Sequence, residues 1–306
     1  MLPVLFRLPE WLPGLGGQSV TSFGALLLVA FLASGWLLGR ELRHRGLSSA
    51  SSGELVVAAA IGGILGAKLY YLLLHFDAFL SEPVALLLAR GGLVWYGGLL
   101  GGAAAVAWRA RRLALPLPVL ADAAAPALAL GYALGRIGCF LVGDDYGLPT
   151  AFPLGLAFPA GAPPTTPANL LEYFGATTSP AALTATGHVR VHPTQLYEAG
   201  LAFGTLALLL WLGRRGASRA EGSGTGAFAP GRLLGLYLVL AGASRFAVEF
   251  LRAKDDRLLG PITIAQLLSL VLAAAGAWLL RNRRLAAVPA APRAASPRRP
   301  IAASPS

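Results

Sequence analysis

The sequence GRIGCFLVGDDYG, residues 135–147, closes an apolar run that begins near Leu117. It places the guanidinium of Arg136 at the end of that run, and Asp144 and Asp145 follow shortly afterwards. In a bilayer an arginine faces the interior of a helix bundle, a watery cavity or an anionic partner, or it reaches the headgroups from a helix end. Arg136 therefore indicates either a polar site inside a membrane bundle or a simple helix boundary.

The composition is that of a membrane protein. Of the 306 residues, 56% are hydrophobic and only 13% are charged, whereas a soluble domain carries roughly 25% charged residues. The net charge of +11 is gathered into clusters that follow apolar runs, which is typical of membrane topology and argues against a nucleic-acid partner. The single cysteine excludes an internal disulfide framework.

Seven apolar runs have about the 20 residues that a membrane-crossing helix needs. The predicted fold class is therefore an all-α integral membrane protein with seven transmembrane helices. The predicted spans are residues 19–38, 55–74, 91–108, 117–140, 195–212, 231–251 and 262–280.

Arginine clusters follow the first, third, fifth and seventh spans, at residues 40–45, 109–112, 214–219 and 281–284. Because basic residues favour the cytoplasmic side, the N-terminus is predicted outside and the C-terminus in the cytoplasm. Residues 1–285 form the predicted membrane domain, with an outside loop over 141–194. Residues 286–306, rich in Ala, Pro, Ser and Arg, are predicted to be a disordered basic tail.

Four polar groups fall toward the outer half of this predicted bundle. Each also has an ordinary explanation: an interfacial tyrosine, a headgroup-seeking arginine, a helix-capping cluster, and an ion pair within one helix. Their convergence instead indicates a site for an anion, and a phospholipid phosphate is the abundant anion at that depth. The groups are Tyr96; Arg136 with Asp144 and Asp145; His192, Gln195 and Glu198 on one predicted helical face; and Arg245, Glu249 and Arg252.

Residues 18–281 resemble the prolipoprotein diacylglyceryl transferase family. The resemblance is carried by motifs in the family's order: GGLLGG at 97–102, GRIG at 135–138, HPTQLYE at 192–198, RFAVEFLR at 245–252 and GPITIAQ at 260–266. It implies a transferase that moves the diacylglyceryl group of phosphatidylglycerol onto the lipobox cysteine of a preprolipoprotein. The implied partners are phosphatidylglycerol and preprolipoprotein signal peptides, and the implied location is the bacterial inner membrane.

The resemblance also implies the site residues. Tyr96, Arg136 and Arg245 stand at the expected catalytic positions, and the two arginines would stabilise the leaving phosphate. The expected lipid-binding residues are Arg136, Asp144, Gly147, His192, Glu249 and Arg252. We expect a monomer that needs no cofactor and no metal.

The chain departs from the family's usual residues at four positions. The family usually has histidine at Tyr96, asparagine at Cys139, glutamate at Asp144 and tyrosine at Phe23. Tyr96 either works as a phenolate stabilised by nearby arginines or only orients the lipid. These departures leave two other hypotheses open: a divergent relative with another lipid or acceptor, and a phospholipid-binding membrane protein without chemistry.

Overall fold

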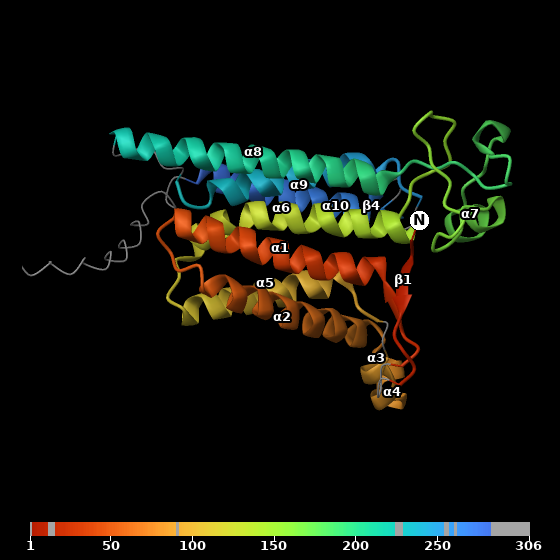
Figure 1. The fold of residues 1–306 in the computed structure, drawn as a ribbon, viewed down its shortest axis with the longest axis horizontal. Helices are drawn as coiled ribbons and strands as arrows, with labels where there is room; N and C mark the ends of the chain where they lie inside the picture. Colours follow the sequence, from red (N-terminus) through yellow and green to blue (C-terminus); the bar gives the residue numbers. More distant parts are fainter. Residues whose placement is uncertain are drawn as a thin grey trace, which may run out of the picture. The chain divides into compact units, whose positions relative to one another are not determined.

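A computed structural model describes residues 2–11, 16–89, 92–223, 229–253, 257–259 and 262–282. The predicted tail, 286–306, lies outside the described residues, as do Gly260 and Pro261 of the last sequence motif. The described chain is mostly helical (Figure 1). Each predicted span overlaps one long helix: α1 Ser22–His44, α2 Ser51–Leu74, α5 Trp95–Arg112, α6 Leu117–Val142, α8 Thr194–Ser223, α9 Arg232–Glu249 and α10 Ile264–Arg281.

Among the described residues, five helices are long and apolar enough to cross a membrane: α1, α2, α6, α8 over Thr194–Arg215, and α10. Their large apolar side chains point outward; Leu28, Leu65 and Val271 are 61%, 64% and 56% exposed. Outward apolar faces suit a protein whose solvent is lipid. The two remaining long helices, α5 and α9, each carry three charged residues.

Several helices extend beyond the predicted spans. α1 continues to His44 and α5 to Arg112, so that each arginine cluster begins inside the helix rather than after it. Each predicted span ends at its last apolar residue, but a helix can continue beyond the apolar region where the following residues favour helix. The short helices α3 Phe76–Ser81 and α4 Pro83–Leu88 occupy the segment between α2 and α5.

Two short hairpins were not predicted. β1 Val4–Arg7 pairs antiparallel with β2 Ser19–Thr21, and β3 Arg257–Leu259 pairs antiparallel with β4 Ile262–Thr263. Strands of two to four residues have too few alternating positions to produce a readable pattern.

The chain divides into two compact units, residues 1–37 with 124–287, and residues 38–123 with 288–306. In the second unit α2 packs on α5 through glycines. A Cβ atom added to Gly62 or Gly66 of α2 would collide with the backbone of Gly101 or Gly97 of α5. These glycines therefore set the close approach of the two helices.

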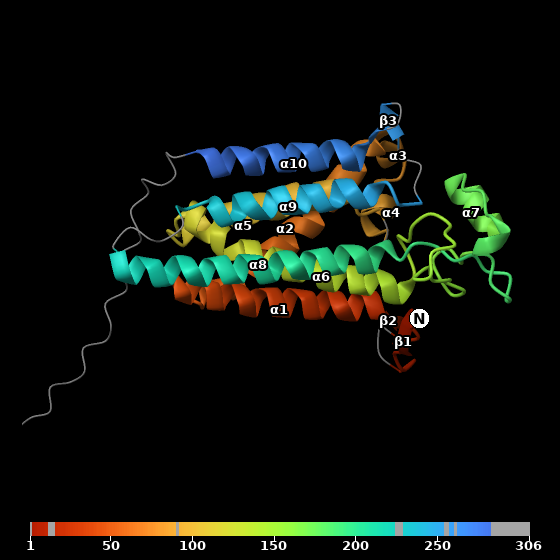
Figure 2. The ribbon, with the colours of Figure 1, turned by 90° about the horizontal axis from the view of Figure 1, so that it is seen from above.

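In the first unit α9 packs against both α8 and α10 (Figure 2). α6 contacts α1: Ser34 Oγ of α1 donates a hydrogen bond of 3.0 Å to the carbonyl of Ala127 in α6. The section 143–193 includes α7 Pro167–Phe174 and the 3-10 helix η1 Pro180–Ala182, and it has its own hydrophobic core. That core contains Tyr146, Phe158, Leu170, Ala176, Ala182, Val189 and Val191.

Candidate functional site

Three arginines of the first unit meet at one buried carboxylate. Glu198, in the second turn of α8, is only 2% exposed. Its Oε2 lies 3.0 Å from Arg136 Nε of α6 and 3.6 Å from Arg252 Nη1, just beyond α9. Its Oε1 lies 3.8 Å from Arg245 Nη1 of α9 and accepts a 2.9 Å hydrogen bond from Tyr132. Guanidinium groups from separate elements therefore converge on α8.

A second buried acid supports two of these arginines. Glu249 forms an ion pair with Arg245, one helical turn away, and lies 3.7 Å from Arg252 Nε. Thr263 Oγ1, at the N-cap of α10, donates a 2.9 Å hydrogen bond to Glu249 Oε1. Arg245 and Glu249 do pair within one helix, but Arg245 also faces Glu198 and so belongs to the larger cluster.

A third acid, Asp145, bridges two of the arginines. Its Oδ2 lies 2.9 Å from Arg136 Nη1 and its Oδ1 lies 2.5 Å from Arg252 Nη2. Burial disfavours the charged carboxylate, but the guanidinium groups of Arg252 and Arg136 outweigh this and lower the pKa of Asp145 below its ordinary value. Asp145 is therefore ionised at neutral pH.

We call Arg136, Arg245, Arg252, Asp145, Glu198 and Glu249 the arginine cluster. Three positive and three negative charges balance in it, which is what a low-dielectric environment requires. Arg245 Nη1 and Arg252 Nε and Nη1 are buried and face carboxylate oxygens of Glu249 and Glu198 as ion pairs. The buried side of the cluster is therefore held together by acids of the chain itself.

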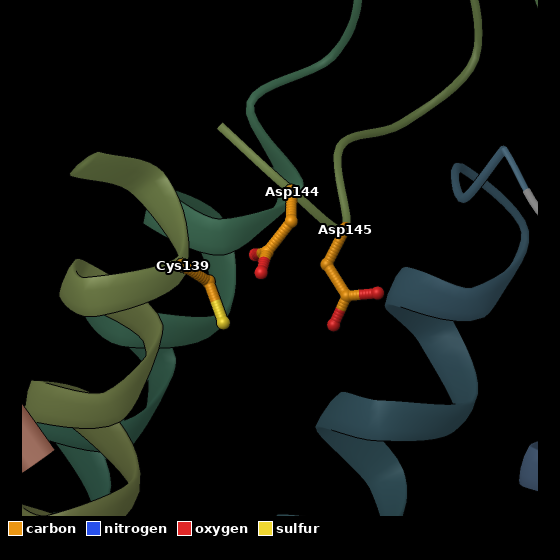
Figure 3. Close-up of side chains that lie close together, drawn as sticks. All are labelled: Cys139, Asp144 and Asp145. Atoms are coloured by element: carbon orange, nitrogen blue, oxygen red, sulfur yellow. The ribbon is translucent and has the colours of Figure 1, made fainter. Parts of the chain in front are cut away.

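Cys139, Asp144 and Asp145 face a common space beside this cluster (Figure 3). Their possible metal-ligating atoms lie within 4.8 Å of one another. Arg136 Nη1 lies 3.9 Å from Cys139 Sγ and also pairs with Asp145. Burial raises the pKa of Asp144 above its ordinary value, against the opposing effects of the Cys139 thiol and the arginines. Asp145 already pairs with Arg136 and Arg252 here, so guanidinium groups balance its charge.

The predicted helical face of His192, Gln195 and Glu198 is correct only in part. α8 begins at Thr194, so His192 lies before the helix. The backbone of His192 instead pairs with residues 147 and 148. Pro193, which follows it, disfavours helical geometry at His192. Its ring Nδ1 lies 3.3 Å from the hydroxyl of Tyr197, and burial lowers the pKa of His192.

Gly147 lies where the loop after α6 meets the segment after α9. Its amide donates a 2.8 Å hydrogen bond to the carbonyl of His192, and it forms a β-bridge with Arg252. A Cβ atom at position 147 would collide with the carbonyl oxygen of Leu251 and lie 2.8 Å from His192 Cβ. The absence of a side chain at Gly147 therefore helps to position Arg252.

We expect Gly147→Ala to displace Arg252 by forcing these segments apart. The expected result is a loss of about 1–3 kcal/mol of stability, as for overpacking elsewhere, together with reduced activity. Thermal unfolding and turnover of the purified protein measure the two effects. Gly200→Ala in α8 is the control, because a Cβ atom there has open space. An active, stable Gly147→Ala protein would contradict this role.

Tyr96 is the second residue of α5 and packs edge-on against Trp95, with ring centroids 5.4 Å apart. It belongs to the unit that contains residues 38–123, whereas every member of the arginine cluster belongs to the other unit. The structure thus brings together Arg136, Asp144, Gly147, His192, Arg245, Glu249 and Arg252 in one unit.

The site residues that the family resemblance implies do not include Glu198 and Asp145, although both belong to the four polar groups that the sequence places toward the outer half of the predicted bundle. The number of charges points to these two acids, because three arginines in apolar surroundings require about three acids to balance them. Among the described residues, Asp144 forms no ion pair with the arginines, whereas Asp145 and Glu198 do.

The apolar helices and the enclosed arginine cluster define a multi-pass membrane protein with a charged internal site. The chain belongs to the prolipoprotein diacylglyceryl transferase family, whose family model matches residues 11–281.

Similar proteins include the phosphatidylglycerol–prolipoprotein diacylglyceryl transferase of Clostridium tetani, 31% identical over 88% of this chain and 93% of that protein. Proteins with the same name from Geobacter sulfurreducens and Gloeobacter violaceus are 34% and 35% identical. These matches cover 87% and 88% of this chain, and 89% and 91% of the respective relatives. The predicted family resemblance is confirmed.

Proposed function

We propose that this chain transfers the diacylglyceryl group of phosphatidylglycerol to the lipobox cysteine thiol of preprolipoproteins and releases glycerol phosphate. The relatives' names support the substrates. In the reaction the thiol sulfur attacks the glycerol carbon, an S–C bond forms, and the C–O bond to phosphate breaks. The thiol proton is lost, and the released phosphate carries the electron pair of the broken bond.

The convergence of three guanidinium groups on Glu198 is the observation that carries this proposal. A phosphate that leaves with extra negative charge needs preorganised donors around it. Arg136 and Arg245 are proposed to supply them, with Arg252 as a third. Glu198 and Glu249 hold these side chains in place, so little reorganisation is needed when charge develops.

Asp144, Gly147 and His192 are proposed to shape the lipid-binding part of the site. Gly147 forms a β-bridge between the loop after α6 and Arg252, and the side chain of Asp144 lies close to those of Cys139 and Asp145 (Figure 3). His192 is half-buried with a lowered pKa, so it is neutral at pH 7 and offers a hydrogen bond rather than a charge.

The thiol must lose its proton to become a good nucleophile. Tyr96 is proposed either to accept that proton under the influence of arginines or to orient the lipid through its hydroxyl. An unperturbed tyrosine has a pKa of about 10 and is a poor base at neutral pH.

We expect Tyr96→Phe to reduce turnover by about 10²-fold or more if the hydroxyl takes part in proton transfer. If Tyr96 only orients the lipid, the Michaelis constant for phosphatidylglycerol rises and turnover changes little. Steady-state kinetics of the purified protein distinguish the two roles. If neither turnover nor the Michaelis constant changes, Tyr96 is not part of the site.

The proposed topology has seven spans, with α5 and α9 added to the five apolar helices, the N-terminus outside and the C-terminus in the cytoplasm. The internal charges of α9 are neutralised in the arginine cluster, which supports its inclusion. Residues 1–285 are proposed to be a monomeric domain of the bacterial inner membrane without a nucleic-acid partner. Its section 141–194 is proposed to lie outside, and residues 286–306 are proposed to be a disordered tail.

Reconstitution tests the proposed function. The purified protein is mixed with labelled phosphatidylglycerol and a peptide that carries a lipobox cysteine, and the thioether product is measured. The departures at Tyr96, Cys139 and Asp144 favour a second candidate, a relative that uses another anionic lipid or acceptor. Replacing the lipid or the peptide in the same assay tests that candidate. Lipid binding without any transfer would contradict both.

A further inference from the structure

Asp145 is the accessible acid of the arginine cluster. Its side chain is 43% exposed, whereas those of Glu198 and Glu249 are 2% and 1% exposed. Glu198 and Glu249 therefore support the guanidinium groups from inside the protein. Asp145 covers Arg136 and Arg252, whose own side chains are only 15% and 4% exposed.

Only the side chain of Asp145 would need to move to free the atoms Arg136 Nη1 and Arg252 Nη2 that it contacts. Thr194 Oγ1 donates a 2.9 Å hydrogen bond to the carbonyl of Asp145, and Gln195 Nε2 donates one of 2.5 Å to the carbonyl of Asp144. The backbone is thus held by the first residues of α8. Asp145 has a φ of 58°, in the left-handed region that aspartate and asparagine tolerate better than most residues.

A lipid phosphate adds a negative charge to a cluster that is already balanced by its own acids. If the phosphate displaced a buried glutamate, that glutamate would be left as an unpaired buried charge, which is strongly unfavourable. If the phosphate displaced the side chain of Asp145, this carboxylate would turn outward to where water can hydrate it. The exchange of one anion for another on Arg136 and Arg252 is therefore easiest at Asp145.

We propose that Asp145 is a displaceable counter-ion, whose carboxylate occupies the place on Arg136 and Arg252 that a phosphate monoester or diester takes when lipid binds. This inference rests on the proposed function for the identity of the anion. It assigns to Asp145 a role in lipid affinity rather than in the chemical step. Asp145 balances the positive charges of the two arginines until the phosphate arrives.

Asp145→Asn tests the proposal, because asparagine has a similar shape and tolerates the same φ but has no charge. Loss of the two ion pairs that compete with the lipid phosphate is expected to lower the Michaelis constant for phosphatidylglycerol about 2- to 10-fold. Turnover at saturating lipid is expected to change less than about twofold. Asp145→Glu retains the competing charge and is expected to keep the Michaelis constant close to that of the wild type.

Glu172→Gln is the matched control, since it removes one carboxylate from an exposed position on α7. It leaves both kinetic constants unchanged if the effect of Asp145→Asn is local. A higher Michaelis constant or a tenfold loss of turnover in Asp145→Asn would overturn the proposal, because Asp145 would then position the arginines instead of competing for them. An equal effect of Glu172→Gln would also overturn it.

A binding measurement tests the counter-ion role of Asp145 without relying on diacylglyceryl transfer. Glycerol phosphate is titrated into the detergent-solubilised protein and the shift in thermal unfolding is followed. Asp145→Asn is expected to respond at a several-fold lower concentration than the wild type. If the wild type transfers nothing, the proposed function fails, and this titration still supports or overturns the exchange at Asp145. Equal responses of the two proteins would overturn it even if transfer is observed.

Discussion

Replacement of Arg136 by alanine is expected to reduce diacylglyceryl transfer by at least about 10²–10³-fold, the usual effect of removing one preorganised donor to a developing anion. Arg136 contacts Glu198 through Nε and Asp145 through Nη1 at the same time. Arg136→Lys keeps the charge, but a single ammonium group cannot reproduce the planar fork. We therefore expect Arg136→Lys to be impaired as well, although less than Arg136→Ala.

The measurement is the rate of thioether formation, with the unfolding midpoint of each variant determined in parallel. Arg281→Ala, at the exposed end of α10, is the control for loss of an arginine. In cells, Arg136→Ala is expected to fail to complement loss of the bacterial transferase. Full transfer by Arg136→Ala would show that the cluster does not hold the phosphate.

Replacement of Glu198 by glutamine is expected to have the largest effect on stability. Three guanidinium groups would then share two carboxylates, with one positive charge left buried and uncompensated. Breaking a buried ion pair from one side typically costs about 3–5 kcal/mol. Because Glu198 also orients Arg136, Arg245 and Arg252, transfer should fall together with stability.

An SDS titration followed by circular dichroism measures the loss of stability. Glu54→Gln is the matched control, since Glu54 is 47% exposed and pairs with Arg109. An exposed pair of this kind contributes at most about 1 kcal/mol. Adding glycerol phosphate should partly restore Glu198→Gln, because the anion supplies the missing negative charge. A variant as stable as Glu54→Gln would show that Glu198 is not central to the cluster.

Sequence patterns located the long helices but not their exact ends. The predicted spans matched runs of apolar residues, and each of those runs became helical. The ends differed because helices such as α1 and α5 continue through their arginine clusters. His192 was placed on a helix because three-residue spacing resembles a helical face. Its backbone instead pairs with residues 147 and 148, a contact between residues far apart in the chain.

Composition and local order are enough to indicate the membrane class, the apolar helices, the family motifs and the arginines. The contacts between distant segments were needed to show that the three arginines meet on Glu198 and that Asp145 is the exposed acid of the cluster. Burial and ion pairing depend on which helix faces which, and residues 47 to 107 positions apart in the chain have no local pattern that reports their distance in space.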